Sequence, residues 1–219
     1  YQSPARLYEA RKNSVKAIQN LEDYLNKFKG VIIMVTHDRY FLDRVTNKIL
    51  EISYGKLYGY NTDYEGLRAL IKRENIDLKD KKVLILGTGG TSKTANVVAA
   101  DMGAAEILTV SRRKSEGRIT YEEAVGWHAD AQVIINTTPS GMYPDCEGKP
   151  IDVSAFDALE GVIDAVYNPL STNLILNAKQ KGAKAEGGLY MLVMQAVVAV
   201  ERFLDVHIPK EKADAVFAG

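Results

Sequence analysis

Two kinds of hydrophobic pattern alternate along this chain: short apolar runs typical of buried strands, and longer stretches with helical spacing. The apolar runs predict strands at 31–35, 48–53, 83–86, 106–110, 132–136, 162–166 and 183–185. The helical spacing predicts helices at 5–28, 40–46, 65–74, 92–102 and 190–204, with a turn-rich join around Gly55 and Gly59. Because strands alternate with helices, the sequence predicts an α/β, Rossmann-like fold with a doubly wound parallel sheet, preceded by an α-β-α-β segment.

A glycine cluster follows one of these strands and opens the next helix. The run Val83-Leu-Ile-Leu86 ends at Gly87-Thr-Gly-Gly90, and the strand at 106–110 completes a βαβ unit. Gly87 permits a tight strand-to-helix turn, while Gly89 and Gly90 carry no Cβ that would block a pyrophosphate. The helix that follows offers unpaired N–H groups to an anion. The sequence therefore predicts a dinucleotide-binding unit.

The residues after the second strand of this unit bear on the choice of dinucleotide. An acidic residue there suits the ribose 2′-hydroxyl of NAD, and an arginine suits the 2′-phosphate of NADP. Here the strand runs into Ser111-Arg-Arg-Lys114, with no acidic residue before Glu116. This favours NADP, and a solvated basic loop is the alternative interpretation.

Composition and charge narrow the class of protein. The 219 residues are 46% hydrophobic and 26% charged, as in a globular protein, and 28 basic residues balance 28 acidic ones. This balance gives no reason to expect nucleic-acid or membrane binding. No apolar stretch has membrane-spanning length and no signal peptide is recognisable, so a cytoplasmic location is expected. Histidines and the single cysteine show no metal-ligand spacing, so no metal site is expected.

Five motifs in the second part of the chain resemble those of shikimate dehydrogenases, in the same order and spacing. They span roughly residues 55–219 and are Gly59-Tyr-Asn-Thr-Asp63, the glycine loop 87–90, Asn136-Thr-Thr-Pro-Ser-Gly-Met142, Asp164-Ala-Val-Tyr-Asn-Pro169 with Thr172 and Leu174, and Gly188-Leu-Tyr-Met-Leu-Val-Met-Gln195. The resemblance implies an NADP-binding domain whose family reduces 3-dehydroshikimate to shikimate. It leaves quinate open as the substrate.

The same resemblance implies roles for individual residues. Asp63 matches a catalytic aspartate that works with a lysine, and no lysine stands in register near Thr36–Tyr40. Substrate contacts are expected from Asn61, Tyr167 and Gln195. The cofactor contacts are expected from Gly87, Gly89, Gly90, Thr91, Ser111, Arg112, Lys114, Asn136, Thr137, Met142, Gly188 and Met191.

Each of these roles has an ordinary structural alternative. Asp63 also suits a turn or the N-cap of the helix at 65–74. The segment Asn136–Pro139 also suits a turn that ends a strand, and Gln195 is also one polar position on an otherwise apolar helix.

The first 58 residues carry a second resemblance, to the end of a nucleotide-binding domain of ABC-F ATPases. It spans roughly residues 15–58 and rests chiefly on Thr36-His-Asp-Arg-Tyr-Phe41, where the matching histidine senses a γ-phosphate. No phosphate loop and no Walker-B carboxylates precede Leu21, so His37 is interpreted as structural. We therefore expect two domains, 1–58 and 59–219, in a chimera of natural or engineered origin. A degenerate dehydrogenase substrate domain is the alternative for the first.

These motifs and resemblances lead to two alternative predictions of function. The first is an NADP-dependent oxidoreductase acting on a shikimate-like small molecule, with turnover reduced by the missing lysine. The second is a non-enzymatic chimeric or truncated scaffold. The sequence leaves the oligomeric state open.

Overall fold

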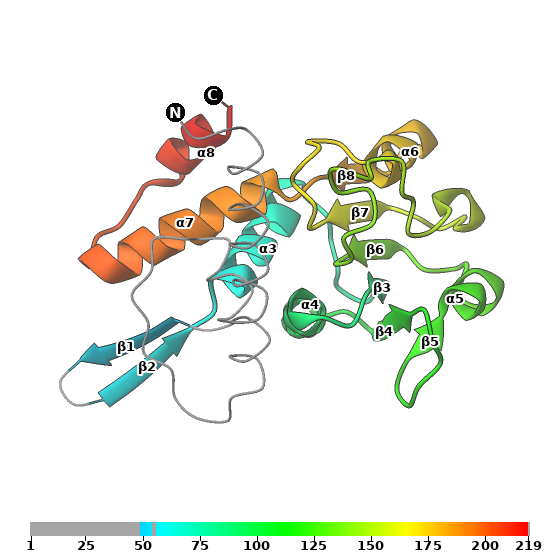
Figure 1. Ribbon diagram of the computed structural model, residues 1–219, viewed down its shortest axis with the longest axis horizontal. Helices are drawn as coiled ribbons and strands as arrows, with labels where there is room; N and C mark the ends of the chain where they lie inside the picture. Colours follow the sequence, from blue (N-terminus) through cyan, green and yellow to red (C-terminus); the bar gives the residue numbers. More distant parts are fainter. Residues whose placement is uncertain (1–48, 54–55, 219) are drawn as a thin grey trace, which may run out of the picture. The chain divides into compact units, whose positions relative to one another are not determined.

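The computed structural model describes residues 49–53 and 56–218 (Figure 1). The chain divides into two compact units, Tyr1–Tyr60 and Asn61–Gly219. The helices predicted at 5–28 and 40–46, the strand at 31–35 and the ATPase-like motif around His37 lie outside the described residues.

An antiparallel hairpin makes up the described part of the first unit. Strand β1 (Ile49–Ser53) pairs with β2 (Lys56–Tyr60), and Ser53 lies opposite Lys56. β1 confirms the strand predicted at 48–53. The turn-rich join predicted around Gly55 and Gly59 is wrong in part, because residues 56–60 form the second strand. Leucine and tyrosine between the two glycines favour a strand, and this preference outweighs that of Gly59 for a turn.

A six-stranded, fully parallel sheet forms the centre of the second unit, in the order β5-β4-β3-β6-β7-β8. In chain order the strands are β3 (Lys82–Leu86), β4 (Glu106–Ser111), β5 (Ile119–Thr120), β6 (Val133–Asn136), β7 (Gly161–Asp164) and β8 (Lys184–Glu186). The predicted doubly wound parallel sheet is confirmed. Its strand order reverses between β3 and β6, and in such sheets ligands bind outside the carboxyl ends of the strands at this point.

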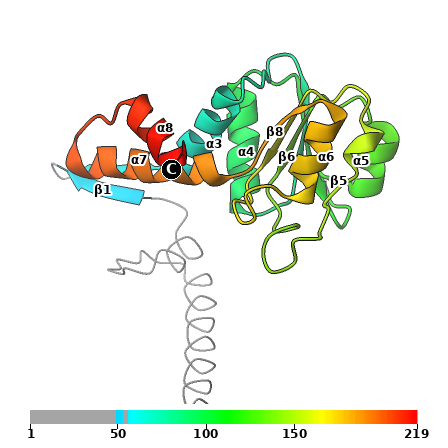
Figure 2. The same cartoon turned by 90° about the horizontal axis from the view of Figure 1, so that it is seen from above.

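Helices cover both faces of this sheet. They are α3 (Thr62–Arg73), α4 (Gly90–Asp101), α5 (Tyr121–Trp127), the 3₁₀ turn η1 (Val153–Ala155), α6 (Asn173–Lys181), α7 (Leu189–Leu204) and α8 (Lys210–Ala218). Seen from above, α5 and α6 lie on one face, and α3 and α4 on the other (Figure 2). The sequence analysis did not predict β5, α5, α6 and α8. β5 has only two residues, too few to show a periodicity.

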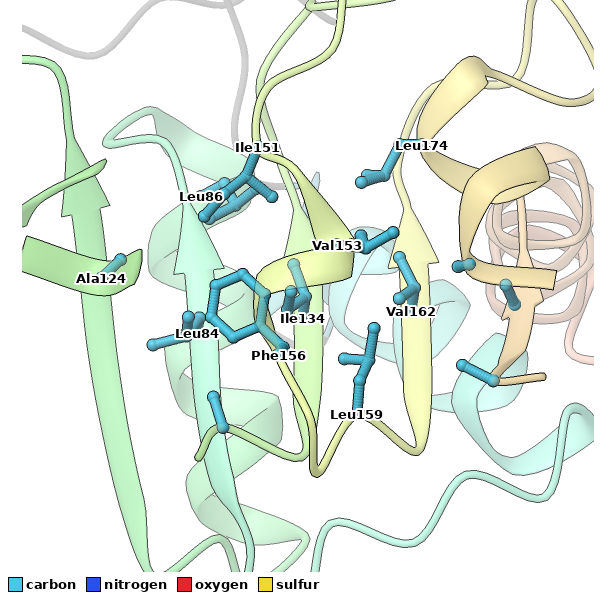
Figure 3. Packing of buried hydrophobic residues seen from close by; sticks show 14 of the residues in the cluster. Leu84, Leu86, Ala124, Ile134, Ile151, Val153, Phe156, Leu159, Val162 and Leu174 are labelled. Carbon is cyan, nitrogen blue, oxygen red and sulfur yellow. The ribbon is translucent and has the colours of Figure 1, made fainter. Parts of the chain in front are cut away.

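Two apolar clusters hold the helices to the sheet, and β3 contributes to both. Val83 and Ile85 pack with α3, α4 and α7, whereas Leu84 and Leu86 pack with α5, α6 and η1 (Figure 3). All four side chains are fully buried. Successive side chains of a strand point to opposite faces, so a parallel strand covered on both sides is apolar at every position.

Hydrogen bonds from side chains to the backbone set two element boundaries that the sequence analysis placed differently. The Asn61 side chain accepts from the backbone N–H groups of Asp63 (3.0 Å) and Tyr64 (3.3 Å), so α3 starts at Thr62 instead of residue 65. The N-cap alternative for Asp63 is therefore wrong. β7 ends at Asp164 instead of residue 166, because the Asp164 carboxylate accepts from the Val166 N–H (3.0 Å). That bond turns the backbone out of the sheet.

Within residues 49–53 and 56–218, no helix is both long and apolar enough to cross a membrane. The same residues contain no group of three or more His, Cys, Asp or Glu side chains arranged to hold a metal ion.

Candidate functional site

Open space lies in front of the first turn of α4, at the carboxyl end of β3. Gly87 turns the chain with a φ of +109°, and a Cβ on it would lie 2.8 Å from the Thr137 hydroxyl. Gly89 is the N-cap of α4 and supplies no side-chain cap for the helix. A Cβ built on Gly89 or Gly90 would meet nothing within 4 Å. The unpaired N–H groups of Gly90, Thr91 and Ser92 therefore border a space that an anion can enter.

The basic segment after β4 is held in place by its own contacts. The Ser111 side chain is nearly buried, and its hydroxyl donates to the Arg113 carbonyl oxygen. Lys114 pairs with Glu123, which also accepts from the Thr120 N–H (2.9 Å) in the capping box of α5. Arg112 is exposed. Of the three residues expected here as cofactor contacts, Arg112 therefore presents its charge to solvent, whereas Lys114 shares its charge with a carboxylate.

The end of β6 carries Asn136, which the sequence analysis expected to line a cofactor. Its side chain is fully buried. The amide nitrogen donates to Asp164 (2.9 Å), and the amide oxygen accepts from the N–H (3.0 Å) and hydroxyl (2.7 Å) of Thr138. The side chain of Asn136 is thus occupied in shaping its loop, and its contact with a cofactor stays a prediction.

The loops after β6 and β7 meet at the same edge of the sheet. The Thr137 hydroxyl donates to the Leu86 carbonyl oxygen (2.6 Å) at the end of β3. The Tyr143 N–H donates to the Asn168 carbonyl oxygen (2.9 Å), which ties the two loops together. Met142 and Tyr167 are 43% and 48% exposed. Both large side chains are therefore available to a ligand at this edge.

Helices α3 and α7 bring two further candidates to facing surfaces. A Cβ on Gly66 of α3 would lie 3.0 Å from Cγ of Gln195 on α7. Asp63 lies one turn before Gly66 and is partly buried. Asn61, which caps α3, donates to the Thr94 hydroxyl of α4 (3.3 Å). Asn61 is thereby linked to the helix that borders the anion space, while Asp63 and Gln195 lie on the two facing helices α3 and α7.

Two expected cofactor contacts on α7 have different surroundings in the structure. Met191 is 4% exposed and belongs to the apolar cluster shared by α3, α4 and α7. A Cβ on Gly188 would lie 2.3 Å from the Ala165 carbonyl oxygen. Met191 is therefore a core residue with little side-chain surface left for a cofactor. Gly188 lacks a side chain where the loop after β7 approaches it, and a backbone contact between Gly188 and the cofactor stays a prediction.

The sequence analysis missed Asp164 and Thr172 as site residues, although both stood in a quoted motif. Asp164 is fully buried and accepts from the Thr172 hydroxyl (2.7 Å). Burial raises the pKa of the Asp164 carboxyl, and the hydrogen bonds from Thr172, Val166 and Asn136 partly oppose that rise. The available signal was a single acidic residue inside the apolar run 162–166, which predicts a buried carboxylate that needs partners.

The strand order, the glycine turn and the open helix N-terminus together define a dinucleotide-binding unit of the doubly wound class. No protein-family profile matches the chain. The shikimate dehydrogenase (NADP(+)) of Clostridium beijerinckii is 30% identical over 234 residues, covering 97% of this chain and 85% of the relative. The chain therefore belongs to the shikimate dehydrogenase family.

Other relatives support this membership. The shikimate dehydrogenase (NADP(+)) of Caldicellulosiruptor bescii is 36% identical over 173 residues, covering 69% of this chain and 58% of that enzyme. The crystal structure of shikimate dehydrogenase 1 from Peptoclostridium difficile superposes with a TM-score of 0.70 at 31% identity. That match covers 93% of this chain and 82% of the other.

Proposed function

We propose that this chain binds NADP and that its reaction is the NADP-dependent interconversion of 3-dehydroshikimate and shikimate. The observation that carries the proposal is the open space at the positions where Gly89 and Gly90 would bear a Cβ. A pyrophosphate fits against the unpaired N–H groups there, and the relatives in Clostridium and Caldicellulosiruptor carry NADP(+) in their names.

Arg112 is the residue we propose for the 2′-phosphate. It is exposed at the end of β4. At this position, dinucleotide-binding proteins with this fold distinguish NADP from NAD. We expect Lys114 to contribute less, because it is paired with Glu123. Bound NADPH supplies a hydride to the carbonyl carbon of 3-dehydroshikimate.

Asp63, Asn61, Gln195 and Tyr167 are the residues we propose for the substrate. The first three lie on or beside α3 and α7, and Tyr167 lies on the loop after β7. Asp63 takes part in moving the proton to the developing alkoxide. Because no lysine stands in register with its family partner, we expect turnover to be reduced by about 10²–10⁴-fold.

Two alternative origins are proposed for the first 58 residues. We propose that they derive from an ABC-F ATPase fragment, on the strength of Thr36–Phe41. The alternative, a degenerate substrate domain, is supported by the Clostridium beijerinckii match, since coverage of 97% of the chain extends into these residues. ATP hydrolysis is expected from neither, and turnover of ATP that disappears in His37→Ala would contradict this expectation.

Isothermal titration with NADP⁺ and NAD⁺ tests the cofactor assignment. We expect NADP⁺ to bind at least about tenfold more tightly, which corresponds to about 1.4 kcal/mol. Gly89→Val fills the open space and should weaken binding of both cofactors. Its unfolding free energy should fall by no more than about 1 kcal/mol, because nothing lies within 4 Å of the new Cβ and only the preference for glycine at the N-cap is lost. Unchanged NADP⁺ binding by a folded Gly89→Val protein would place the pyrophosphate elsewhere.

A steady-state assay with shikimate and with quinate at saturating NADP⁺ tests the reaction. We expect a trace of oxidation that Asp63→Asn abolishes. The rival function, a non-enzymatic scaffold, predicts neither NADP⁺ binding nor oxidation. A rate within about tenfold of a full-length shikimate dehydrogenase, lost in Asp63→Asn, would show that another group replaces the lysine.

A further inference from the structure

Asp164 is a buried carboxylate at the carboxyl end of β7, and both of its oxygens accept hydrogen bonds. Oδ1 accepts from the Asn136 amide (2.9 Å) and the Val166 N–H (3.0 Å), and Oδ2 accepts from the Thr172 hydroxyl (2.7 Å). The side chain is 0% exposed. It therefore cannot reach a ligand directly in this arrangement, and its three partners come from different segments.

These partners fix both ends of the loop that carries Tyr167. Val166 precedes Tyr167, and Thr172 closes the loop as the N-cap of α6, where its hydroxyl also accepts from the Ile175 N–H (3.4 Å). One carboxyl group thus holds the two ends of the seven-residue span 166–172. The exposed Tyr167 lies between them.

The same carboxylate holds the loop that carries Met142. Through Asn136 it is connected to the N–H and hydroxyl of Thr138, at the start of that loop. The Val166 carbonyl oxygen also accepts from the Gly188 N–H (2.8 Å), at the start of α7. Three segments at the carboxyl edge of the sheet therefore depend on one buried group.

We propose that Asp164 is a positioning residue, which sets the loops of Met142 and Tyr167 for the nicotinamide and substrate side of the site without touching either ligand. This inference rests on the proposed function for the identity of the ligands. A carboxylate suits the task because its four lone pairs accept several donors at once, and bonds to a charged acceptor are stronger than neutral ones.

Asp164→Asn is the central variant. The amide keeps an oxygen for Asn136 and Val166 but turns a donor toward Thr172. Thr172→Val removes the hydroxyl at nearly constant shape, and Thr172→Ser restores it. Leu159→Ala serves as the matched control, because Leu159 lies in the core near the amino end of the same strand.

Hydrogen exchange of the ligand-free protein gives the first readout. In Asp164→Asn and Thr172→Val, amides of 137–143 and 165–172 should exchange about tenfold faster, while those of 82–101 remain unchanged. Thr172→Ser should exchange like the unmodified protein. Leu159→Ala should not reproduce this localised pattern. Unchanged exchange in both loops of Asp164→Asn, or equal acceleration throughout the sheet, would overturn the proposal.

Binding of NADP⁺ and of 2′,5′-ADP, which lacks the nicotinamide half, gives the second readout. Asp164→Asn should weaken NADP⁺ by about tenfold and leave 2′,5′-ADP within about twofold. Equal weakening of both would show general destabilisation and overturn the proposal. Failure of the unmodified protein to bind either compound would instead refute the proposed function, and the exchange experiment would still decide the positioning role of Asp164.

Discussion

Gly66 on α3 lies so close to Met191 on α7 that a Cβ on the glycine would be 2.6 Å from the Met191 carbonyl oxygen. The Cβ would clash with a backbone atom, so no rotation of a side chain can relieve the clash. The separation of α3 and α7 is therefore set by the absence of a side chain at residue 66. Asp63 and Gln195 lie on these two helices, so the contact also fixes their spacing.

Gly66→Ala should accordingly destabilise the protein by about 1–3 kcal/mol, because the helices must separate to admit the methyl group. Urea denaturation followed by circular dichroism measures the loss. Gly126→Ala is the control, since Gly126 lies in α5 and its Cβ would meet nothing within 4 Å. There the better helix propensity of alanine should stabilise by up to about 1 kcal/mol. Similar effects of the two substitutions would contradict this account of the helix contact.

Arg112→Ala should remove most of the preference for NADP⁺ over NAD⁺, a loss of about 1.4 kcal/mol in NADP⁺ binding. Lys114→Ala should have a smaller effect, because Lys114 is paired with Glu123. Calorimetric titration of each variant with both cofactors measures the preference. Lys212→Ala, an exposed change on α8, serves as the control for a general loss of positive charge. Equal effects of the three substitutions would leave the basic segment after β4 without a specific role.

Arg73 should stabilise the packing of α8 against α3 and α7 by more than an exposed arginine normally would. Its guanidinium lies 4.6 Å from the Tyr190 ring centre and 4.4 Å from that of Phe217, and pairs with Asp214 at 2.8 Å. Tyr190 also donates to Asp214 (2.9 Å). Because the ion pair is partly exposed, solvent screening reduces its contribution. We therefore expect Arg73→Ala to cost about 1–2 kcal/mol in total, mostly from the contacts with the rings.

Limited proteolysis within residues 205–218, together with urea denaturation, measures this effect. Arg73→Ala should expose α8 to cleavage, whereas Lys72→Ala on the exposed side of the same helix should not. Arg73→Lys should give an intermediate result, since lysine keeps the charge and loses the planar stacking. Cleavage rates that are the same in all three variants would contradict the attachment.

Burial raises the pKa of the Asp164 carboxyl. The unfolding free energy should therefore depend on pH through this group. The folded chain keeps this proton to a higher pH than the unfolded chain, where the pKa is about 3.9. The stabilising contribution of this group is therefore fully present below about pH 3.9 and is lost as pH rises through the folded-state pKa. Asp164→Asn cannot ionise and lacks this dependence.

Urea denaturation of the unmodified protein and Asp164→Asn between about pH 4 and 8 isolates the effect, because the other titrating groups are common to both. The unfolding free energy of the unmodified protein minus that of the variant should decrease with rising pH and then level off. A difference that increases with pH would mean that the hydrogen bonds to the carboxylate outweigh its burial.

The sequence by itself determined the class of fold and predicted the glycine turn that we propose for the dinucleotide. The run at 83–86, the glycines at 87, 89 and 90 and the helix that follows are local features, and their periodicity and conformational freedom do not depend on distant residues. The doubly wound parallel sheet was also predictable, since alternation of strands and helices leaves few parallel arrangements.

Only the tertiary structure decided which candidate side chains are buried or already paired. Asn136 carries the expected chemical groups, but Asp164, which is distant in sequence, already pairs with its amide. Lys114 is paired with Glu123 on the following helix. Met191 is taken up by the core, and Gly188 owes its missing side chain to the Ala165 carbonyl oxygen. A sequence shows which groups a residue offers, whereas burial and pairing depend on how separate segments pack, and packing determines which of those groups are left for a ligand.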